Sequence, residues 1–276
     1  MAPGSAQQIG TVMRYELLKY LLGWRLLAIV LLTVLMSAIF LVVPPAIGSA
    51  YPSDPKVFVK NMLSFLLVLS VLSATFFGAD AIVSEYESKT GYFLFPNPIR
   101  KTSIFLGKFT ASALVSVGAI TLYYLIAVVS VRVIDGSIPA NTGVSFAYSL
   151  VYLFAILAIA YLFSAVMHSS VYSLVLAFFT FLLIMPTIDF VGSMAQFKPW
   201  FSITFAGGIS QYVLQNPYPT DRVLPPMVSP IGPQAGTTPY SLVLYYPEIH
   251  LSLIVIAAYF VIAFGLGFVI ARRREM

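Results

Sequence analysis

The sequence predicts an all-α, polytopic membrane protein. We expect six transmembrane helices, an N-terminal interfacial helix, and an outer proline-rich loop with short helices before the last span. Of the 276 residues, 59% are hydrophobic and only 9% are charged, and the mean hydropathy is +0.93, which excludes a water-soluble domain. Charge-free stretches of about 20 residues are long enough to cross a bilayer. Six such stretches cover residues 26–43, 61–79, 109–131, 146–167, 171–188 and 251–271, so we treat residues 1–276 as a single transmembrane domain.

The six stretches predict helices because they are uniformly apolar, whereas the strands of a membrane barrel alternate lipid-facing and lumen-facing residues. Before them, residues 6–25 predict an amphipathic helix in the interface plane. Its apolar side chains recur every three or four residues: Ile9, Val12, Met13, Leu17, Tyr20, Leu21 and Trp24. The alternative is an irregular start to the first span. A cleaved signal peptide is disfavoured, because the first apolar run of about 18 residues exceeds a signal core.

Basic residues predict the orientation. With six spans both termini lie on one side of the membrane, and Lys and Arg concentrate on the cytoplasmic side. The flanks on the side of the termini hold ten: Arg14, Lys19, Arg25, Lys89, Arg100, Lys101, Lys108, Arg272, Arg273 and Arg274. The other flanks hold five: Lys56, Lys60, Arg132, Lys198 and Arg222. We therefore predict a multi-pass protein of the plasma membrane with cytoplasmic termini.

The longest predicted loop, residues 189–250, lies on the outer side and contains nine of the eighteen prolines. Its first part, residues 194–214, is apolar and aromatic, and it predicts one or two short helices at the outer face before a proline-interrupted loop. In contrast, only residues 168–170 join the fourth span to the fifth, which predicts a tight hairpin on the cytoplasmic side.

Several chemical functions find no support in the sequence. There is no cysteine, so thiolate nucleophiles and zinc–thiolate sites are excluded. Phe109 follows the pair Gly107–Lys108, so the phosphate-binding loop ending in Gly-Lys-Ser/Thr is missing. His168 and His250 fall on opposite sides of the membrane and share no metal. We therefore predict no catalytic, cofactor-binding or metal-binding residue. The net charge of +5 comes from residues flanking apolar runs, which points to the membrane and away from nucleic acid.

Energy for transport has no evident source within the predicted spans. None of the six contains Asp, Glu, His, Lys or Arg, whereas ion-coupled carriers and proton pumps generally place ionisable groups at membrane depth. Sodium sites built from carbonyls and hydroxyls stay possible. If the protein moves a substrate uphill, we expect the energy to come from another subunit.

The cytoplasmic loop of residues 80–108 holds seven of the 25 charged residues. Its first part, residues 80–89, predicts a polar continuation of the second span, ended at Gly91. Pro96 and Pro98 predict an extended turn, and Thr102 or Ser103 a cap for the third span. On charge alone, a solvated loop with orientation charges explains this segment equally well.

The same loop resembles the membrane subunits of type-2 exporters of the ABC transporter class. The resemblance rests on Asp80 and Glu85, then Ser88-Lys89-Thr90-Gly91, Phe93-Leu94-Phe95-Pro96, Ile99-Arg100-Lys101 and Leu106-Gly107-Lys108. It extends to the N-terminal helix, the six spans, the short fourth-to-fifth turn and the long loop before the last span. The order Thr90–Gly91 reverses that of the family, and Pro98 adds a second proline.

The resemblance implies a dimer of two permease chains, identical or different, with two separate cytoplasmic ATPase subunits that bind ATP and magnesium. This chain would supply no cofactor and no enzyme activity, and its other partners would be membrane lipids. The implied coupling residues lie in and around residues 86–96: Glu85, Glu87, Tyr92, Phe93, Leu94, Phe95, Arg100 and Lys101. An apolar patch, Tyr92 to Phe95, would enter a groove on the ATPase, and the charges would orient it.

In permeases of this class the second and fifth spans line the translocation path. Here that implies Asn61, Ser64, Ser73, Phe77, Tyr172, Phe178 and Thr180 as possible lining residues. Such a surface favours an amphipathic or hydrophobic cargo, although small and hydroxylated residues also serve ordinary helix packing. Two other functions stay open: a stand-alone channel or secondary carrier, and a membrane anchor that presents an extracellular binding loop.

Overall fold

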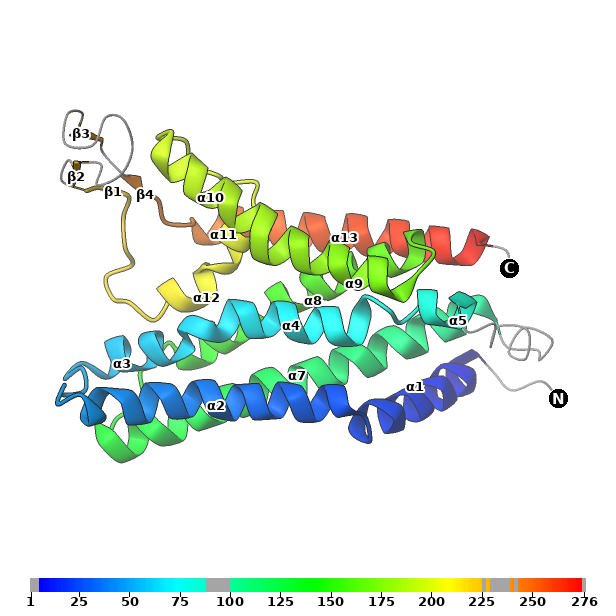
Figure 1. Cartoon of the computed structure of the whole chain (residues 1–276), viewed down its shortest axis with the longest axis horizontal. Helices are drawn as coiled ribbons and strands as arrows, with labels where there is room; N and C mark the ends of the chain where they lie inside the picture. The colour runs from blue at the N-terminus through cyan, green and yellow to red at the C-terminus, as the bar shows by residue number, and fades with distance from the viewer. Residues whose placement is uncertain (1–4, 88–99, 225–226, 229–238, 241–242, 275–276) are drawn as a thin grey trace.

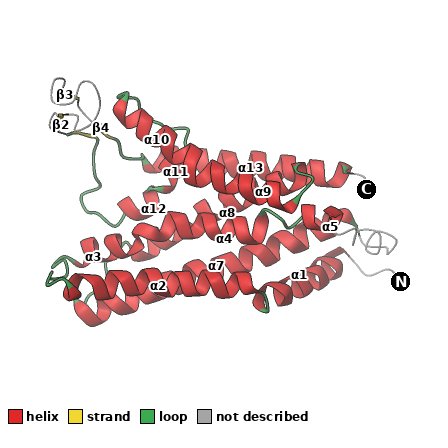
Figure 2. Cartoon of the chain, viewed as in Figure 1, coloured by secondary structure: helices red, strands yellow, loops and turns green. Residues whose placement is uncertain are grey.

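The computed structural model describes residues 5–87, 100–224, 227–228, 239–240 and 243–274. Six of its helical segments are long and apolar enough to cross a membrane: Trp24–Ala46, Pro55–Glu87, Lys101–Ile134, Thr142–Val166, Ser170–Met194 and Ile249–Arg273. Each coincides with one of the predicted spans. The all-α fold with six spans is therefore confirmed, and Figure 2 shows how little of the described chain is strand.

The first half of the chain starts with helix α1, Ser5–Leu21, which turns at Leu22 and Gly23 into the first span, α2, Trp24–Ala46. The second span is built in pieces. Helix α3, Pro55–Met62, continues through a single 3-10 turn, η1, Leu63–Phe65, into α4, Leu66–Gly78. A turn over residues 79–82 then leads to α5, Val83–Glu87. Asp54 caps α3 by accepting a hydrogen bond from the Lys56 amide at 2.9 Å.

The second half begins with the third and fourth spans, α7, Lys101–Ile134, and α8, Thr142–Val166. The fifth span contains α9, Ser170–Phe178, a π-helical segment η2, Phe179–Ile184, and α10, Met185–Met194. Helix α9 starts four residues after α8 ends, so the predicted tight hairpin is confirmed. The last span is α13, Ile249–Arg273.

The loop before the last span contains α11, Ile203–Gly207, and α12, Ile209–Tyr212, as predicted for its first part. The rest differs from the prediction of a plain loop, because two short antiparallel ladders form in it. Strand β1, Arg222–Val223, pairs with β4, Val243–Leu244, and β2, Met227–Val228, pairs with β3, Pro239–Tyr240. Lys198 donates hydrogen bonds to Asp221 at 3.0 Å and to Glu248 at 3.2 Å, which ties this loop to the start of α13.

The helices pack in two groups around α4 and α8 (Figure 1). Helices α1, α2 and α3 lie with α7 on one side, while α9, α10, α11 and α13 lie on the other. Packing is most extensive between α13 and α8 and between α1 and α7. Both termini and α5 lie at one end of the bundle, and the strands lie at the opposite end (Figure 1). The predicted placement of both termini at one end agrees with this arrangement.

One predicted cap is wrong. Helix α7 begins at Lys101, with Arg100 and not Thr102 or Ser103 at the capping position. The Arg100 amide instead donates a 3.3 Å hydrogen bond to the side-chain oxygen of Gln8 on α1. This contact comes from a residue 92 positions away in sequence, where no local pattern could reveal it.

Candidate functional site

The candidate site surrounds α5 at the end of the bundle that holds both termini. A serine on a neighbouring helix holds the backbone at the start of α5 in place. Ser164 on α8 is fully buried, and its hydroxyl oxygen accepts hydrogen bonds from the amides of Ile82 at 2.9 Å and Val83 at 3.0 Å. The first amides of a helix have no partner within it, so this serine satisfies donors that the turn over residues 79–82 leaves free. It thereby sets the direction in which α5 leaves α4.

We expect Ser164→Ala to loosen this junction, because two buried amides would lose their acceptor at about 1–3 kcal/mol each. Hydrogen exchange in detergent should then become faster at Ile82 and Val83. Ser73→Ala is the matched control: Ser73 is also fully buried, but its hydroxyl has no hydrogen-bond partner among the described residues. Equal exchange in the two variants would contradict the role assigned to Ser164.

A buried lysine connects α5 to the N-terminal helix. The side chain of Lys108 on α7 is 2% exposed, and its ammonium lies 2.5 Å from Glu16 on α1 and 2.7 Å from Glu85 on α5. A charge this deeply buried needs charged partners. Glu16, Lys108 and Glu85, here termed the acid–lysine triad, therefore join three helices that are distant in sequence.

The neighbouring glycine makes this contact possible. A Cβ atom on Gly107 would lie 2.8 Å from the Val12 side chain and 3.0 Å from the Ile9 carbonyl oxygen, both on α1. Only a residue without a side chain lets α1 approach α7 this closely. The pair Gly107–Lys108 therefore has two distinct roles: the glycine admits α1, and the lysine binds it to α5.

A second polar cluster lies beside the triad. Arg25, at the start of α2, lies 2.6 Å from Asp80 in the turn before α5 and donates to the Phe76 carbonyl at 3.0 Å. The Tyr20 hydroxyl lies 3.1 Å from the Phe77 carbonyl oxygen, to which it donates, and 3.2 Å from Ser112. Burial, followed by the nearby Glu16 charge, raises the pKa of Tyr20 to about 12, so its hydroxyl keeps its proton. The turn after α4 is thus fixed to α1 and to α2.

The opposite side of α5 contacts the fifth span and the end of the last. Glu87 accepts hydrogen bonds from the Ser170 amide at 2.8 Å and the Ser169 hydroxyl at 3.3 Å, which caps α9. The Arg274 guanidinium lies 4.4 Å from the centre of the Tyr86 ring and donates to the Ala165 carbonyl at 3.0 Å. Lys101 donates to the Arg274 carbonyl at 2.9 Å. Four residues of α5, Val83, Glu85, Tyr86 and Glu87, therefore contact four other helices or their ends.

This arrangement holds helices together. Lys108 pairs with Glu16 and Glu85, and Arg25 pairs with Asp80, whereas Lys101 and Arg274 donate to backbone carbonyls and Glu87 accepts from two serines. Among the residues that the structure describes, no three His, Cys, Asp or Glu side chains lie close enough to hold a metal ion. What the geometry shows is a set of polar contacts that join helices distant in sequence.

Comparison with known proteins identifies the family. The model of the family described as ABC-2 family transporter protein matches residues 11–276, which is nearly the whole chain. The chain belongs to this ABC-2 family. A search of curated proteins finds no match. The chain is therefore a membrane permease of the ABC transporter class and not its catalytic component, and permeases of this family generally work with ABC ATPase partners.

The structure places the expected coupling residues of this ABC-2 permease in two groups. Glu85 and Glu87 lie on α5 with the partners given above, and Arg100 and Lys101 lie at the start of α7. Arg100 is exposed, and Lys101 is half-buried beside Arg274. Tyr92, Phe93, Leu94 and Phe95 lie outside the described residues. The four described residues flank the segment 88–99 on both sides.

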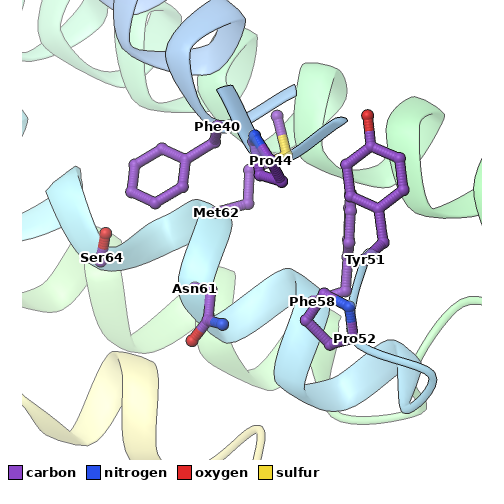
Figure 3. Close-up of a pocket in the computed structure, with 8 residues that line it drawn as sticks. All are labelled: Phe40, Pro44, Tyr51, Pro52, Phe58, Asn61, Met62 and Ser64. Carbon is purple, nitrogen blue, oxygen red and sulfur yellow. The ribbon is translucent and has the colours of Figure 1, made fainter. Parts of the chain in front are cut away.

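The possible lining residues differ in how far they are exposed. Asn61 and Ser64 are exposed and line a pocket of about 300 Å³ between the end of α2 and the start of the second span, with Phe40, Pro44 and Tyr51 on its other side (Figure 3). Ser73 and Phe77 are fully buried within the permease chain, and Phe77 packs against Tyr20.

On the fifth span, Tyr172 is 69% exposed, while Phe178 and Thr180 are half-buried. Asn61, Ser64 and Tyr172 are thus the candidates that present an open surface in this conformation. Ser73 and Phe77 reach a path only if the helices around them separate.

Several residues of the site were not predicted: Glu16, Tyr20, Arg25, Ser164 and Arg274. A signal did exist for Glu16. It lies three residues after Met13 and four before Tyr20, so it falls on the apolar face of α1, where an unpaired carboxylate is unfavourable. That position alone indicates a buried cationic partner, although it does not say which one.

Proposed function

We propose that this permease is the membrane-spanning subunit of an ATP-driven exporter, that two such chains form the translocation path, and that each couples to a separate cytoplasmic ATPase. ATP and magnesium would bind to the ATPases. The observation that carries the proposal is the acid–lysine triad, which connects α5, the helix that precedes residues 88–99 in sequence, to α1 and α7. The family's general use of ABC ATPases supports the identity of the partner.

The contacts of α5 suggest how a movement of the ATPase would reach the spans. A push on residues 88–99 would move α5, and the ion pairs of Glu85 would carry that movement to α7 and α1. The contact between Glu87 and Ser170 would carry it to the fifth span, and Arg274 would carry it to the last. Buried ion pairs resist separation because a lone buried charge is strongly unfavourable. These helices would therefore move together, as a change between inward-open and outward-open states requires.

The exposed surface of the fifth span supports a dimer. Only 11% of its membrane-crossing window is buried within the chain, against 67% for the second and the fourth spans. A second chain placed against it would enclose Tyr172 in a shared path. The walls of that path would be apolar with scattered hydroxyls, which favours an amphipathic or hydrophobic cargo.

The charge distribution supports the orientation. The ten basic residues on the flanks near the termini, against five opposite, favour a cytoplasmic location for α5 and both termini. That location would place the coupling segment where a soluble ATPase can reach it. We propose the plasma membrane as the site and export as the direction.

The sharpest test removes the apolar patch. We expect simultaneous replacement of Tyr92, Phe93, Leu94 and Phe95 by alanine to abolish copurification of a nucleotide-hydrolysing subunit from the native cell, because the patch would supply the buried core of the contact. Copurified ATP turnover is the measurement. The proposal fails if turnover stays with the variant, or if the unaltered chain transports substrate in liposomes without nucleotide.

The control replaces Val129, Val133 and Ile134 by alanine. These side chains are also apolar and exposed, at 60%, 78% and 36%, but they lie in the last turns of α7, outside both the coupling segment and the fifth span. ATP turnover should then copurify unchanged. Loss in both variants would point to a general defect in folding or insertion and would contradict a specific docking role for the patch.

A further inference from the structure

A cavity of about 450 Å³ lies between α8, α13 and the π-helical segment η2. None of its fourteen lining residues is charged. Its inner wall comes from buried side chains such as Phe181 and Ala263, and its rim includes the exposed residues Ala258 and Ile262. Trp200 and Phe201, from the segment between α10 and α11, also line it. The cavity is therefore apolar, open at its side and located within the membrane-crossing part of the bundle.

Local features of two helices create this space. Residues 179–184 form a π-helix, in which each turn is wider than in an α-helix. Pro186 lies two residues after its end, and the missing amide and the ring of this proline disfavour a regular α-helical turn here. Across the gap, α13 presents Ala258 and Ala263. A widened helix thus faces small side chains, and the space between them stays unfilled by protein.

The surroundings determine what can fill the cavity. Apolar walls that face empty space lose dispersion contacts, and a water molecule needs two or more polar partners. The Tyr259 hydroxyl already donates to the Phe201 carbonyl at 3.1 Å, so it offers little to water. In contrast, the medium beside a side opening at this depth is hydrocarbon. An aliphatic chain is therefore the occupant that these walls favour.

The mouth of the cavity suggests how the rest of such a molecule would lie. Trp200, 51% exposed, and Tyr259 are amphipathic aromatic residues, which gather at the level of lipid headgroups. A chain inserted between α8 and α13 would leave its polar end beside them. We propose that this cavity binds one acyl chain of a bilayer phospholipid, held between η2 and α13 with its headgroup near Trp200.

The chain provides its own probe for this proposal. It contains two tryptophans, Trp200 at the cavity and Trp24, 85% exposed at the start of α2. In the Trp24→Phe variant, fluorescence reports on Trp200 alone. We expect phosphatidylcholine with brominated acyl chains, titrated into the purified protein in detergent micelles, to quench this fluorescence in a saturable way. Unbrominated phosphatidylcholine should reverse the quenching.

A matched pair of variants tests the location. Ala258→Phe should fill the cavity and weaken the saturable quenching at least tenfold. Ala257→Phe adds the same ring one residue earlier, at an exposed position that does not line the cavity, and should leave the quenching unchanged. Ile262→Phe provides a second filled cavity and should reproduce Ala258→Phe. All are made in the Trp24→Phe background.

Three results would overturn the proposal. Quenching that rises linearly with brominated lipid and does not reverse would indicate only collision with the micelle. Saturable quenching that survives both filling variants would place the lipid elsewhere. Quenching that occurs in monomers but is absent from purified dimers would indicate that a second chain covers this face. None of these results depends on the ATPase. The first two are also independent of the proposed dimer, and the third distinguishes a lipid from a second chain at this face.

Discussion

Replacing Lys108 by methionine is expected to lower the free energy of unfolding by about 3–5 kcal/mol, the effect of removing one partner from a buried ion pair. Methionine keeps the length and apolar stem of lysine, so packing changes little. However, the partly buried Glu16 and Glu85 would then carry like charges with no cation between them. Denaturant unfolding of the purified protein in detergent measures the change.

A variant without the three charges of the triad distinguishes the effect of charge on stability from the effect of side-chain shape. A variant with Glu16→Gln, Glu85→Gln and Lys108→Met contains no uncompensated charge at this position, and well-packed neutral substitutes for buried ion pairs are often as stable as the originals. We therefore expect most of the lost stability to return. A triple variant as unstable as Lys108→Met alone would mean that the lysine acts through its shape and hydrogen-bond geometry.

Lys19→Met is the surface control. Lys19 also contacts Glu16, at 3.7 Å, but its side chain is 61% exposed. Exposed ion pairs contribute about 1 kcal/mol or less, so this variant should unfold close to the unaltered protein. Similar losses for Lys19→Met and Lys108→Met would contradict the importance of burial in the triad.

Local patterns predict the helices of this permease well, because each span carries its own hydropathy signal. The cap at Asp54, followed by Pro55, even marks where the second span starts, six residues before its predicted apolar run. The short outer ladders were missed, since paired strands of two residues contain too few positions to show alternation. The π-helix before Pro186 was missed as well, because the same apolar composition is compatible with an α-helix and with a π-helix.

The contacts between residues of the site could not be predicted from local sequence, for a different reason. An ionisable residue lies directly next to three of the predicted spans: Asp80 follows the second, Lys108 precedes the third, and Asp189 follows the fifth. A span defined as a charge-free stretch cannot contain such a group. In the structure, however, all three lie within or beside the helices, and Lys108 is almost fully buried. The family motif marked Gly107 and Lys108 as important. Their partners, Val12 and Glu16, are ninety residues away and required the fold.

Gly107→Ala is expected to displace α1 from α7. The new methyl group would lie 2.8 Å from the Cβ and Cγ1 atoms of Val12, and no side-chain rotation can move the Cβ atom away from it. Overpacking of this kind costs about 1–3 kcal/mol, which outweighs the gain of up to about 1 kcal/mol from replacing glycine within a helix. As α1 moves, Glu16 leaves Lys108, and both effects should appear together.

Chemical labelling of Lys108 detects this displacement directly. Its side chain is 2% exposed, so an amine-reactive reagent should modify it slowly in the unaltered protein and faster in Gly107→Ala, as followed by mass spectrometry. Gly118→Ala is the matched control on the same helix, because nothing lies within 4 Å of its added Cβ. That variant should keep Lys108 protected and should be slightly more stable.

A compensating change decides whether steric contact with α1 is the cause. In a double variant with Gly107→Ala and Val12→Gly, the small residue moves to the other helix, and the side-chain atoms that clash are gone. The Ile9 carbonyl oxygen, 3.0 Å from the new methyl group, still requires a small shift. We expect Lys108 to regain most of its protection, because α1 can again approach α7. If labelling stays fast in the double variant, the glycine serves the flexibility of α7 itself, and close approach of the two helices is not what holds the triad together.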